Sequence, residues 1–508
     1  MGGLAETRND KAVAVLAILV SALHIALAGR YDIFRDELYF IVCGQHPSFG
    51  YVDQPAAIPL LAAGLHTLAD GPFPLRIPAA LAAGALVWLA ARFAKMLGGA
   101  GSSELLAALA CALAPMLVGL GGVLSTTTFD PLAWTAIAYL VVRSLRFGSN
   151  RALILAGVIT GLDFNVKYAV AFWIAGLLVG LAASRERYIL GRGSFWLGAS
   201  IAGLMGLPTV LWQALHGFPF LELGVAAQGK NAVVGVGAFM ANQIMVMNPF
   251  AAPLWIIGLC APFIAPNLRD LRFVPIAVLT VFISVRIGNG KDYYLAACYP
   301  VLFVIGSVAI AQFIEGPAKR AAAVIVLALQ AGFAAIAAPV TMPLLSPEAL
   351  SAYMARHGIE PGKQEKSFEG AVLPQGFADQ LGWRDFADQI AFAWQTIPAS
   401  DRGKTAILLD NYGEAAAIDI YGRRMGLPPA LSGHNHYSVW GLRGQHPTDL
   451  IVVQRKPEEL SGLCSQIIVV GVTWSKWAMP GENGKSIIRC ASLKIPIEQL
   501  WPTQRHID

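Results

Sequence analysis

Long runs of apolar residues, interrupted by short polar segments, fill the first two thirds of the chain. A helix needs about 20 predominantly apolar residues to cross a bilayer, and eleven runs reach or approach that length. They lie at 12–29, 76–96, 104–122, 131–147, 151–163, 168–184, 194–214, 250–266, 272–287, 293–313 and 320–340. The pattern predicts a polytopic α-helical membrane protein with about 11 spans, within a range of 11–13.

Residues 345–508 follow a different pattern, in which short apolar runs alternate with turn-rich stretches. Several runs have the length and composition of β-strands, and one longer run is a better helix candidate. The strand candidates are 406–409, 451–453, 466–472 and 486–489, and the helix candidate is 383–396. We therefore expect a membrane domain at 1–344 and a water-soluble domain with an α/β or α+β fold at 345–508.

The composition agrees with this division. Of the 508 residues, 56% are hydrophobic and 14% are charged, and the mean hydropathy is +0.57, whereas soluble domains have about 25% charged residues. This excludes an ordinary soluble enzyme. The net charge of +5 is not gathered into one stripe or tail, so the sequence also argues against nucleic-acid binding.

Basic residues recur between the candidate spans. Lys and Arg concentrate in cytoplasmic loops, and a cytoplasmic N-terminus places two or three of them in each loop on that side. The other face then receives long loops with few basic residues, chiefly 30–75 and 215–249, together with the domain at 345–508. Residues 12–28 lack a convincing small-residue cleavage site, so we expect a first span there and no removable signal peptide.

Most acidic residues of the membrane part fall on the outer face. They are Asp32, Asp36, Glu37, Asp53, Asp70, Asp130, Asp163, Glu222 and Asp292. A carboxylate at the bilayer centre costs about 2.5–3.5 kcal/mol, so we expect those near helix ends to face a wet cavity. The cluster is therefore a hypothesis for the functional site.

The first outer loop contains two short acidic motifs, Asp36-Glu37 and then Asp53-Gln54. A carboxylate just outside the bilayer can take a proton from a hydroxyl group or hold a divalent cation. The alternative is structural, because acids at the start of a helix cap it and pair with neighbours such as Arg35. The apolar stretch that follows this loop motif predicts a helix lying on the membrane surface.

The order of several short motifs resembles the GT-C glycosyltransferases of family 39, the group of protein O-mannosyltransferases and bacterial lipid A aminoarabinose transferases. The motifs are Asp36-Glu37, Tyr51-Val52-Asp53-Gln54-Pro55, Thr127-Thr128-Phe129-Asp130-Pro131, Gly161-Leu162, Lys167-Tyr168, Gly217-Phe218-Pro219-Phe220, Gly290-Lys291-Asp292-Tyr293-Tyr294 and Tyr299-Pro300. The resemblance covers most of 12–340. It implies a GT-C fold and inverting transfer of a sugar from a polyprenyl phosphate carrier to an acceptor hydroxyl.

The resemblance also implies roles for individual residues. Asp36 matches the general base, Glu37 completes its pair, and Asp53 matches the second acidic position of the loop. In aminoarabinose transferases that second position is Glu followed by Lys, so Gln54 leaves a phosphate anchor missing here. The candidates for donor binding are Lys167 and Lys291, with Tyr293 and Asp130 beside them and Arg286 and Lys230 as weaker candidates.

Structural alternatives stay open for these residues. Lys167 follows Asp163 by four positions, which suits an intrahelical ion pair, and Lys291 suits a snorkelling position at the membrane surface. Tyr293 fits an aromatic belt, and Asp130 before Pro131 fits a helix N-cap.

Metal binding is a weaker hypothesis, in which His216 and Glu222 join Asp53 around a divalent ion. His434 and His436 also have a spacing that occurs in metal sites, without an acidic neighbour close by.

We expect a disulfide between Cys464 and Cys490, because they are the two cysteines of a domain predicted to lie in an oxidising compartment.

The sequence therefore favours a glycosyltransferase of the bacterial inner membrane with a periplasmic active site. Its donor would be a polyprenyl phosphate sugar, and its acceptor lipid A, another envelope glycolipid, a polysaccharide or a protein hydroxyl. The domain at 345–508 would shape the acceptor entrance. The alternative is a lipid or solute transporter, but such proteins usually have two similar halves, and no convincing internal repeat is present.

Overall fold

The computed structural model describes residues 8–99, 101–231, 233–312, 316–362, 369–454 and 456–508. The chain forms two compact units. We call them the helical unit, comprising Met1–Ala28, Phe73–Leu211 and Val233–Leu344, and the mixed unit, comprising Gly29–Pro72, Trp212–Ala232 and Leu345–Asp508. The first outer loop and part of the second long loop therefore fold together with the C-terminal residues.

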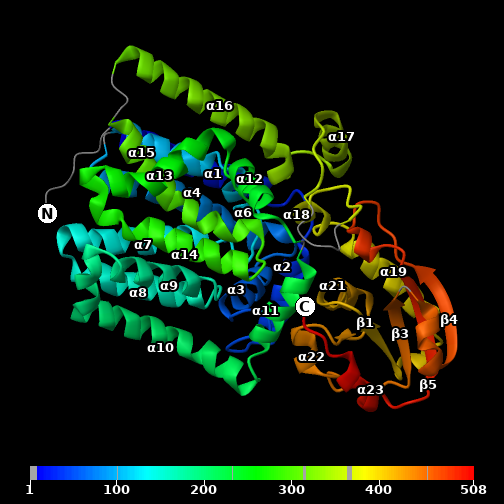
Figure 1. The fold of residues 1–508 in the computed structure, drawn as a ribbon. Helices are drawn as coiled ribbons and strands as arrows, with labels where there is room; N and C mark the ends of the chain where they lie inside the picture. Colours follow the sequence, from blue (N-terminus) through cyan, green and yellow to red (C-terminus); the bar gives the residue numbers. More distant parts are fainter. Residues whose placement is uncertain (1–7, 100, 232, 313–315, 363–368, 455) are drawn as a thin grey trace. The chain divides into compact units, whose positions relative to one another are not determined.

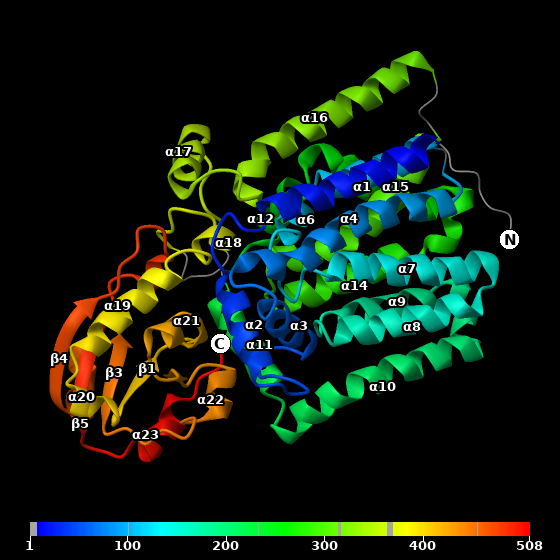
Figure 2. The same cartoon turned by 180° about the vertical axis from the view of Figure 1, so that it is seen from behind.

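Helices run roughly side by side through the helical unit (Figures 1 and 2). The α-helices are α1 (Arg8–Leu27), α4 (Pro72–Met96), α5 (Gly101–Ala112), α6 (Pro115–Leu120), α7 (Asp130–Phe147), α8 (Asn150–Phe164), α9 (Val170–Ala182), α10 (Gly193–Leu215), α12 (Val236–Val246), α13 (Ala252–Ile264), α14 (Phe273–Ile287), α15 (Tyr299–Ala311) and α16 (Pro317–Thr341). Short 3₁₀ helices are η1 (Arg185–Gly191), η2 (Pro249–Ala251), η3 (Pro266–Leu271) and η4 (Asp292–Cys298).

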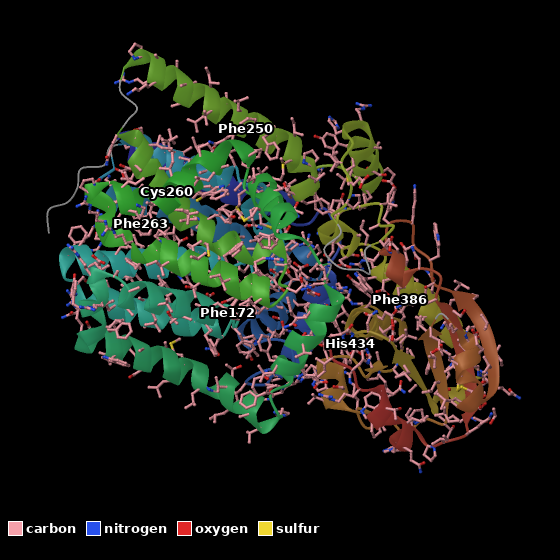
Figure 3. The ribbon with its side chains drawn as sticks, viewed as in Figure 1. Phe172, Phe250, Cys260, Phe263, Phe386 and His434 are labelled. Carbon is pink, nitrogen blue, oxygen red and sulfur yellow. A yellow bond between two sulfur atoms is a disulfide. The ribbon has the colours of Figure 1, made fainter. Side chains whose placement is uncertain are left out.

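Every segment predicted as a span is helical. The run at 104–122 is divided between α5 and α6, and the run at 293–313 between η4 and α15. Five helices of the described residues are long and apolar enough to cross a membrane, or six if the bent pair of α12 and η2–α13 counts as one span. Phe172 and Phe263 project from their helices in Figure 3, and each is at least half exposed. Such faces suit contact with lipid, and the protein is membrane-embedded.

The long loop predicted at 215–249 contains more regular structure than expected. Its residues form α11 (Pro219–Lys230) and α12, which are shorter than a bilayer span because each has about three turns. Both helices therefore fall within a segment that the sequence predicts as a loop.

The mixed unit contains a five-stranded sheet with short helices around it (Figure 1). Its helices are α2 (Arg35–Gln45), α3 (Ala57–His66), α11, α17 (Pro347–His357), α18 (Gln375–Ala378), α19 (Trp383–Gln395), α20 (Ala399–Arg402), α21 (Tyr412–Ile420), α22 (His436–Trp440) and α23 (Ile497–Gln504), with 3₁₀ turns η6 (Gly422–Met425), η7 (Pro457–Gly462) and η8 (Pro480–Glu482). The strands are β1 (Thr405–Leu409), β2 (Leu431–Ser432), β3 (Asp449–Gln454), β4 (Cys464–Val472) and β5 (Ser486–Leu493).

The sheet has the strand order β2-β1-β3-β5-β4. Strands β1, β2 and β3 are parallel, whereas β5 runs antiparallel to both β3 and β4. Because β3 is central, its residues are almost all buried, while the edge strand β4 is mostly exposed. The four predicted strands and the predicted helix at 383–396 are confirmed, and a mixed sheet with flanking helices is an α/β arrangement.

Cys464 and Cys490 form the predicted disulfide between the neighbouring strands β4 and β5, with Cα atoms 5.4 Å apart. The crosslink closes a loop of 26 residues, so the chain-entropy argument gives a stabilisation of about 3 kcal/mol. We expect non-reducing peptide mapping to recover the two cysteine peptides as one joined species, and a Cys464→Ser, Cys490→Ser variant to unfold at a lower temperature. Recovery of both thiols in free form from the unreduced protein would contradict this prediction.

Helix α21 packs closely against α2 within the mixed unit. Gly413 allows this approach, because a Cβ atom at that position would lie 2.7 Å from Cγ of Arg35. The first residues of the two helices are therefore neighbours, although they are about 380 positions apart in the sequence. This contact brings the C-terminal part of the chain to the acidic motif of the first outer loop.

Candidate active site

Asp36 lies in the first turn of α2, where its side chain is 32% exposed. The Tyr412 hydroxyl donates a hydrogen bond to Asp36 Oδ1 over 2.8 Å, and Arg35 Nε lies 3.4 Å from the same oxygen. Among the described residues, no hydrogen bond reaches Oδ2 of Asp36. One oxygen of this carboxylate is thus held in place while the other is available to a ligand.

Glu37 has a different environment from its neighbour. Its side chain is fully buried, and Oε2 accepts the backbone N–H of Phe34 over 2.9 Å at the start of α2. A carboxylate at this position satisfies an otherwise unpaired donor and interacts favourably with the helix dipole. The geometry therefore gives Glu37 the structural role that the sequence left open, and it does not present this carboxylate to an acceptor.

Asp53 has partners at both oxygens. The Tyr39 hydroxyl donates to Oδ1 over 3.0 Å, and the Asn435 amide donates to Oδ2 over 3.4 Å. Burial raises the pKa of Asp53 to about 7, with the nearby charge of Asp36 adding to the shift and the hydrogen bonds opposing it. Asp53 is thus poised to gain or lose a proton near neutral pH.

Aromatic rings surround these two carboxylates. The rings of Tyr39 and Tyr412 lie 4.6 Å apart, and Tyr39 Oη accepts the backbone N–H of His436. Burial lowers the pKa of His436 to about 3, so its ring is neutral and Nδ1 accepts the Val52 N–H. This arrangement holds the loop that carries Asp53 against His436 at the start of α22.

Gln54 is buried next to Asp53, and its backbone carbonyl accepts the Tyr51 N–H. The amide side chain carries no positive charge, so this loop offers no cation to a phosphate at that position. A cation for that purpose has to come from another segment.

The helical unit contains a second polar group. Lys167 Nζ donates to Thr127 Oγ1 over 2.5 Å and lies 3.6 Å from Asp130 Oδ2. The ion pair with Asp163 that the spacing allowed is not formed, because Lys167 turns to Asp130 instead. Asp163 and Asp130 are almost fully buried, and three of their four carboxylate oxygens have no hydrogen-bond partner among the described residues.

Lys167 and Lys291 are connected through two tyrosines. Lys167 Nζ lies 4.9 Å from the ring centre of Tyr294, and Lys291 Nζ lies 5.9 Å from that of Tyr293. The two tyrosine rings meet edge to face, with their centres 4.8 Å apart. Two of the cations that the sequence selected thus lie beside the two rings of one tyrosine pair.

The two weaker cation candidates have other surroundings. Arg286 donates to the backbone carbonyl of Val234 over 2.9 Å and stacks on Phe239. Lys230 belongs to the mixed unit, where its charge acts on Asp508. These contacts differ from those of Lys167 and Lys291, which lie beside the Tyr294 and Tyr293 rings.

The three predicted metal ligands do not converge. Glu222 forms a two-pronged ion pair with Arg505, and the exposed His216 stacks on Trp212. Within the described ranges, only His434, His506 and Asp508 place three potential ligand atoms within 4.8 Å of one another. Asp53 is therefore not joined by His216 and Glu222 around a metal ion.

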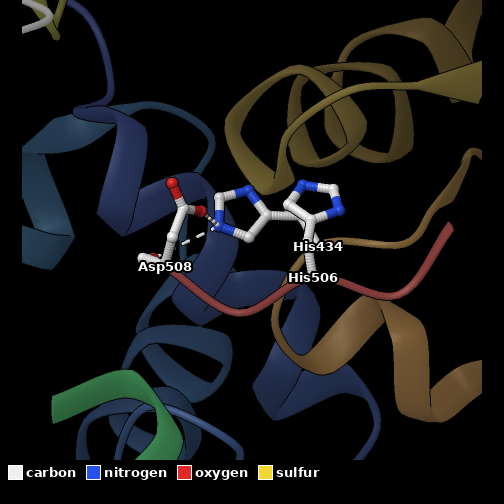
Figure 4. A group of neighbouring side chains, drawn as sticks. All are labelled: His434, His506 and Asp508. Carbon is white, nitrogen blue, oxygen red and sulfur yellow. Dashed lines mark hydrogen bonds and ion pairs between the residues drawn. The ribbon is translucent and has the colours of Figure 1, made fainter. Parts of the chain in front are cut away.

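The group at His434 is satisfied without a metal (Figure 4). His434 Nδ1 accepts the Tyr412 N–H over 3.3 Å, which assigns the ring proton to Nε2, and Nε2 lies 2.6 Å from Asp508 Oδ1. This hydrogen bond lowers the pKa of the Asp508 carboxyl. A metal at Nε2 would have to displace that proton, whereas a metal-bound imidazole normally keeps a proton on its other nitrogen.

Sequence reasoning gave no individual role to several residues of these two separate groups. They are Tyr39, Tyr412 and Asn435 in the mixed unit and Thr127 and Tyr294 in the helical unit. Thr127 and Tyr294 lie within motifs that the resemblance had marked, and His436 was considered only as a metal ligand. No local spacing relates the residues from 412 onward to the first loop, so their contacts with it could not be predicted.

Comparison with known proteins agrees with this architecture. Residues 53–212, about a third of the chain, match the model of a family described as dolichyl-phosphate-mannose-protein mannosyltransferase. Structural similarity to solved proteins extends over nearly the whole chain. The protein has the fold of the GT-C glycosyltransferases.

Among the similar structures is ArnT from Cupriavidus metallidurans, solved bound to undecaprenyl phosphate and in the apo state. Both give a TM-score of 0.61 at 14% and 13% identity, and the match covers 94% and 95% of this chain and 98% of ArnT. The mycobacterial arabinofuranosyltransferase AftD gives a TM-score of 0.53 at 17% identity, over 96% of this chain and 40% of AftD. A search of curated proteins found no match.

Proposed function

We propose that this protein transfers a sugar from a polyprenyl phosphate carrier to a hydroxyl group of an acceptor in the bacterial cell envelope. The observation that carries the proposal is the carboxylate of Asp36, which has one oxygen anchored by Tyr412 and the other available. Lipid A, another glycolipid or a polysaccharide are the acceptor classes. The reaction would take place on the periplasmic side of the inner membrane.

The proposed reaction is a single displacement with inversion. Asp36 accepts the proton of the acceptor hydroxyl as its oxygen forms a bond to the anomeric carbon. The bond from that carbon to the phosphate oxygen breaks, and polyprenyl phosphate leaves with the electron pair. The leaving group gains negative charge, so cations near its oxygens lower the barrier.

Lys167 and Lys291 are the proposed cations for the phosphate. Each ammonium group lies near one ring of the Tyr293–Tyr294 pair. Among the described residues, the oxygen partners of Lys167 Nζ are Thr127 and Asp130. The undecaprenyl phosphate bound to ArnT is a ligand of the chemistry proposed here. The buried oxygens of Asp130 and Asp163 could accept hydrogen bonds from sugar hydroxyls.

Reconstitution into proteoliposomes tests the proposed function. The purified protein is mixed with undecaprenyl phosphate sugars labelled in the sugar, and transfer to lipid A or to a glycolipid extract is measured by mass spectrometry. We expect a labelled product and free undecaprenyl phosphate in equal amounts. Movement of lipid or solute across the vesicle membrane without cleavage of the donor would instead support the transporter.

Replacing Lys167 or Lys291 with alanine is expected to weaken binding of the donor at least about tenfold. A surface ion pair contributes at most about 1 kcal/mol, whereas a phosphate binds the ammonium group through a charge-assisted hydrogen bond. Binding of undecaprenyl phosphate to the purified variants is measured by calorimetry or by native mass spectrometry. Lys404→Ala is the matched control, because Lys404 is an exposed residue paired with Asp401. Unchanged affinity in both lysine variants would assign the phosphate to another site.

A further inference from the structure

We propose that Tyr412 and Asn435, both from the C-terminal part of the chain, are positioning residues that orient Asp36 and Asp53 for the transfer reaction. The inference rests on the proposed function and extends it, because it makes the C-terminal domain part of the catalytic apparatus. It also assigns a role to the last residues of the chain, which hold both positioning residues in place.

Tyr412 determines which oxygen of Asp36 is free. Its hydroxyl and Arg35 Nε both bind Oδ1, so Oδ2 is the oxygen left for the proton of the acceptor. Burial, together with the charges of Asp36 and Asp53, raises the pKa of Tyr412 well above its ordinary value. The hydroxyl therefore stays protonated and remains a donor throughout the physiological range. Arg35 also stacks on the Tyr412 ring, with Cζ 5.4 Å from the ring centre.

Asn435 performs the equivalent task at Asp53. Its amide nitrogen donates to Asp53 Oδ2, while its amide oxygen accepts the backbone N–H of Asp508 over 3.3 Å. Because the oxygen already faces a donor, the nitrogen has to point toward Asp53. Asn435 also adopts a backbone φ of 46°, a left-handed conformation that costs free energy for a side-chain-bearing residue. Strain of this kind persists where the surrounding contacts determine the geometry.

The last residues of the chain connect the two positions. The His506 N–H donates to the Gly433 carbonyl and the Asn435 N–H donates to the His506 carbonyl, both over 3.0 Å. Gly433 permits this pairing, because a Cβ atom there would lie 1.8 Å from the Gln504 carbonyl oxygen. His434 then links Asp508 to the backbone N–H of Tyr412 through its two ring nitrogens.

Arg35 is the other partner of the same carboxylate oxygen. Its Nε lies 3.4 Å from Asp36 Oδ1, and its guanidinium group also lies 3.8 Å from Asp379 Oδ2. Removing the Tyr412 hydroxyl therefore leaves Oδ1 with this longer, shared contact alone, so Oδ2 is held less firmly in its orientation toward the acceptor.

The test compares Tyr412→Phe with Tyr421→Phe. Tyr421 is a matched control, because it is another tyrosine of the C-terminal domain whose hydroxyl donates to a first-loop carboxylate, Asp32, over 3.1 Å. We expect Tyr412→Phe to lower kcat by about 10- to 100-fold with little change in the KM for the donor, as the loss of one hydrogen bond to a charged group allows. Tyr421→Phe should retain the wild-type kcat.

A second measurement does not depend on transfer activity. The carboxyl carbons of ¹³C-labelled aspartate are observed by NMR in the full-length protein, with Asp36→Asn used to assign the Asp36 signal. We expect the chemical shift of the Asp36 carboxyl carbon to change in Tyr412→Phe, which loses the hydrogen bond to that carboxylate, and to keep its wild-type value in Tyr421→Phe. Equal rates and equal Asp36 chemical shifts in the two tyrosine variants would overturn the inference.

Asn435→Ala extends the same test to Asp53. We expect loss of the Asn435 amide to raise the pKa of Asp53 from its value of about 7, because the charged carboxylate loses a hydrogen-bond donor. If the wild-type protein transfers no sugar but the variants show these NMR changes, the proposed function is refuted and the positioning contacts are confirmed.

Discussion

Replacing Asp36 with asparagine is expected to lower the kcat for sugar transfer by about 10²- to 10⁴-fold, the usual contribution of a general base. An asparagine can still accept a hydrogen bond from Tyr412 at its amide oxygen. It cannot accept the proton of the acceptor hydroxyl. We therefore expect binding of the donor and the temperature of unfolding to change little, which separates a chemical defect from a folding defect.

Asp70→Asn provides the control for this variant. Asp70 is an exposed acid of the same loop segment and forms an ion pair with Arg424, so its removal should leave transfer unchanged. Rates are measured with saturating donor and acceptor. Wild-type turnover by Asp36→Asn would show that another residue accepts the proton, and Asp53 would be the next candidate because its pKa lies near 7.

Replacing Lys485 with methionine is expected to lower the melting temperature of the protein by about 10 °C. Lys485 is almost fully buried, and Nζ lies 2.6 Å from Glu414 Oε1 and 3.2 Å from Glu482 Oε2. These two carboxylates raise the pKa of Lys485 above its ordinary value, so the side chain is charged in the folded protein. Removing one partner of a buried ion pair costs about 3–5 kcal/mol, because the remaining charge is left without compensation.

The pH dependence of this destabilisation has a defined sign. Burial raises the pKa of Glu482, but the charge of Lys485 opposes this and holds the pKa below its ordinary value in the wild type. A lowered acid pKa loses stability only as pH falls, whereas in the variant burial acts alone, the pKa lies above the ordinary value, and stability falls as pH rises through the ordinary glutamate range. The variant should therefore be closest to wild type near pH 4 and furthest from it near pH 8. Thermal unfolding in detergent at both pH values measures the effect.

Lys404→Met is the control for this experiment. Lys404 pairs with Asp401 at the surface, and an exposed pair contributes less than about 1 kcal/mol. An equal, small loss in both variants would mean that the Lys485 group is hydrated and contributes little to stability.

Local patterns predicted many of the elements of this protein. Apolar runs predicted the long helices of the membrane part because a span needs about 20 apolar residues, and short runs such as 451–453 predicted four of the five strands. The same patterns placed Cys464 and Cys490 in one domain, where the structure joins them. The prediction of a long loop at 215–249 was incomplete, because the segment contains the short helices α11 and α12.

The sequence by itself therefore determined the long apolar helices, four of the five strands, the disulfide and the acidic loop that contains Asp36 and Asp53. Only the tertiary structure decided how neighbouring acids differ, with Glu37 closing a helix end and Asp36 keeping one oxygen free. It also paired Lys167 with Asp130 in place of Asp163. The physical reason is that the spacing of residues in the sequence indicates contacts within one helix or strand. The contact of Tyr412 with Asp36 depends instead on the packing of α21 against α2, two helices far apart in the sequence.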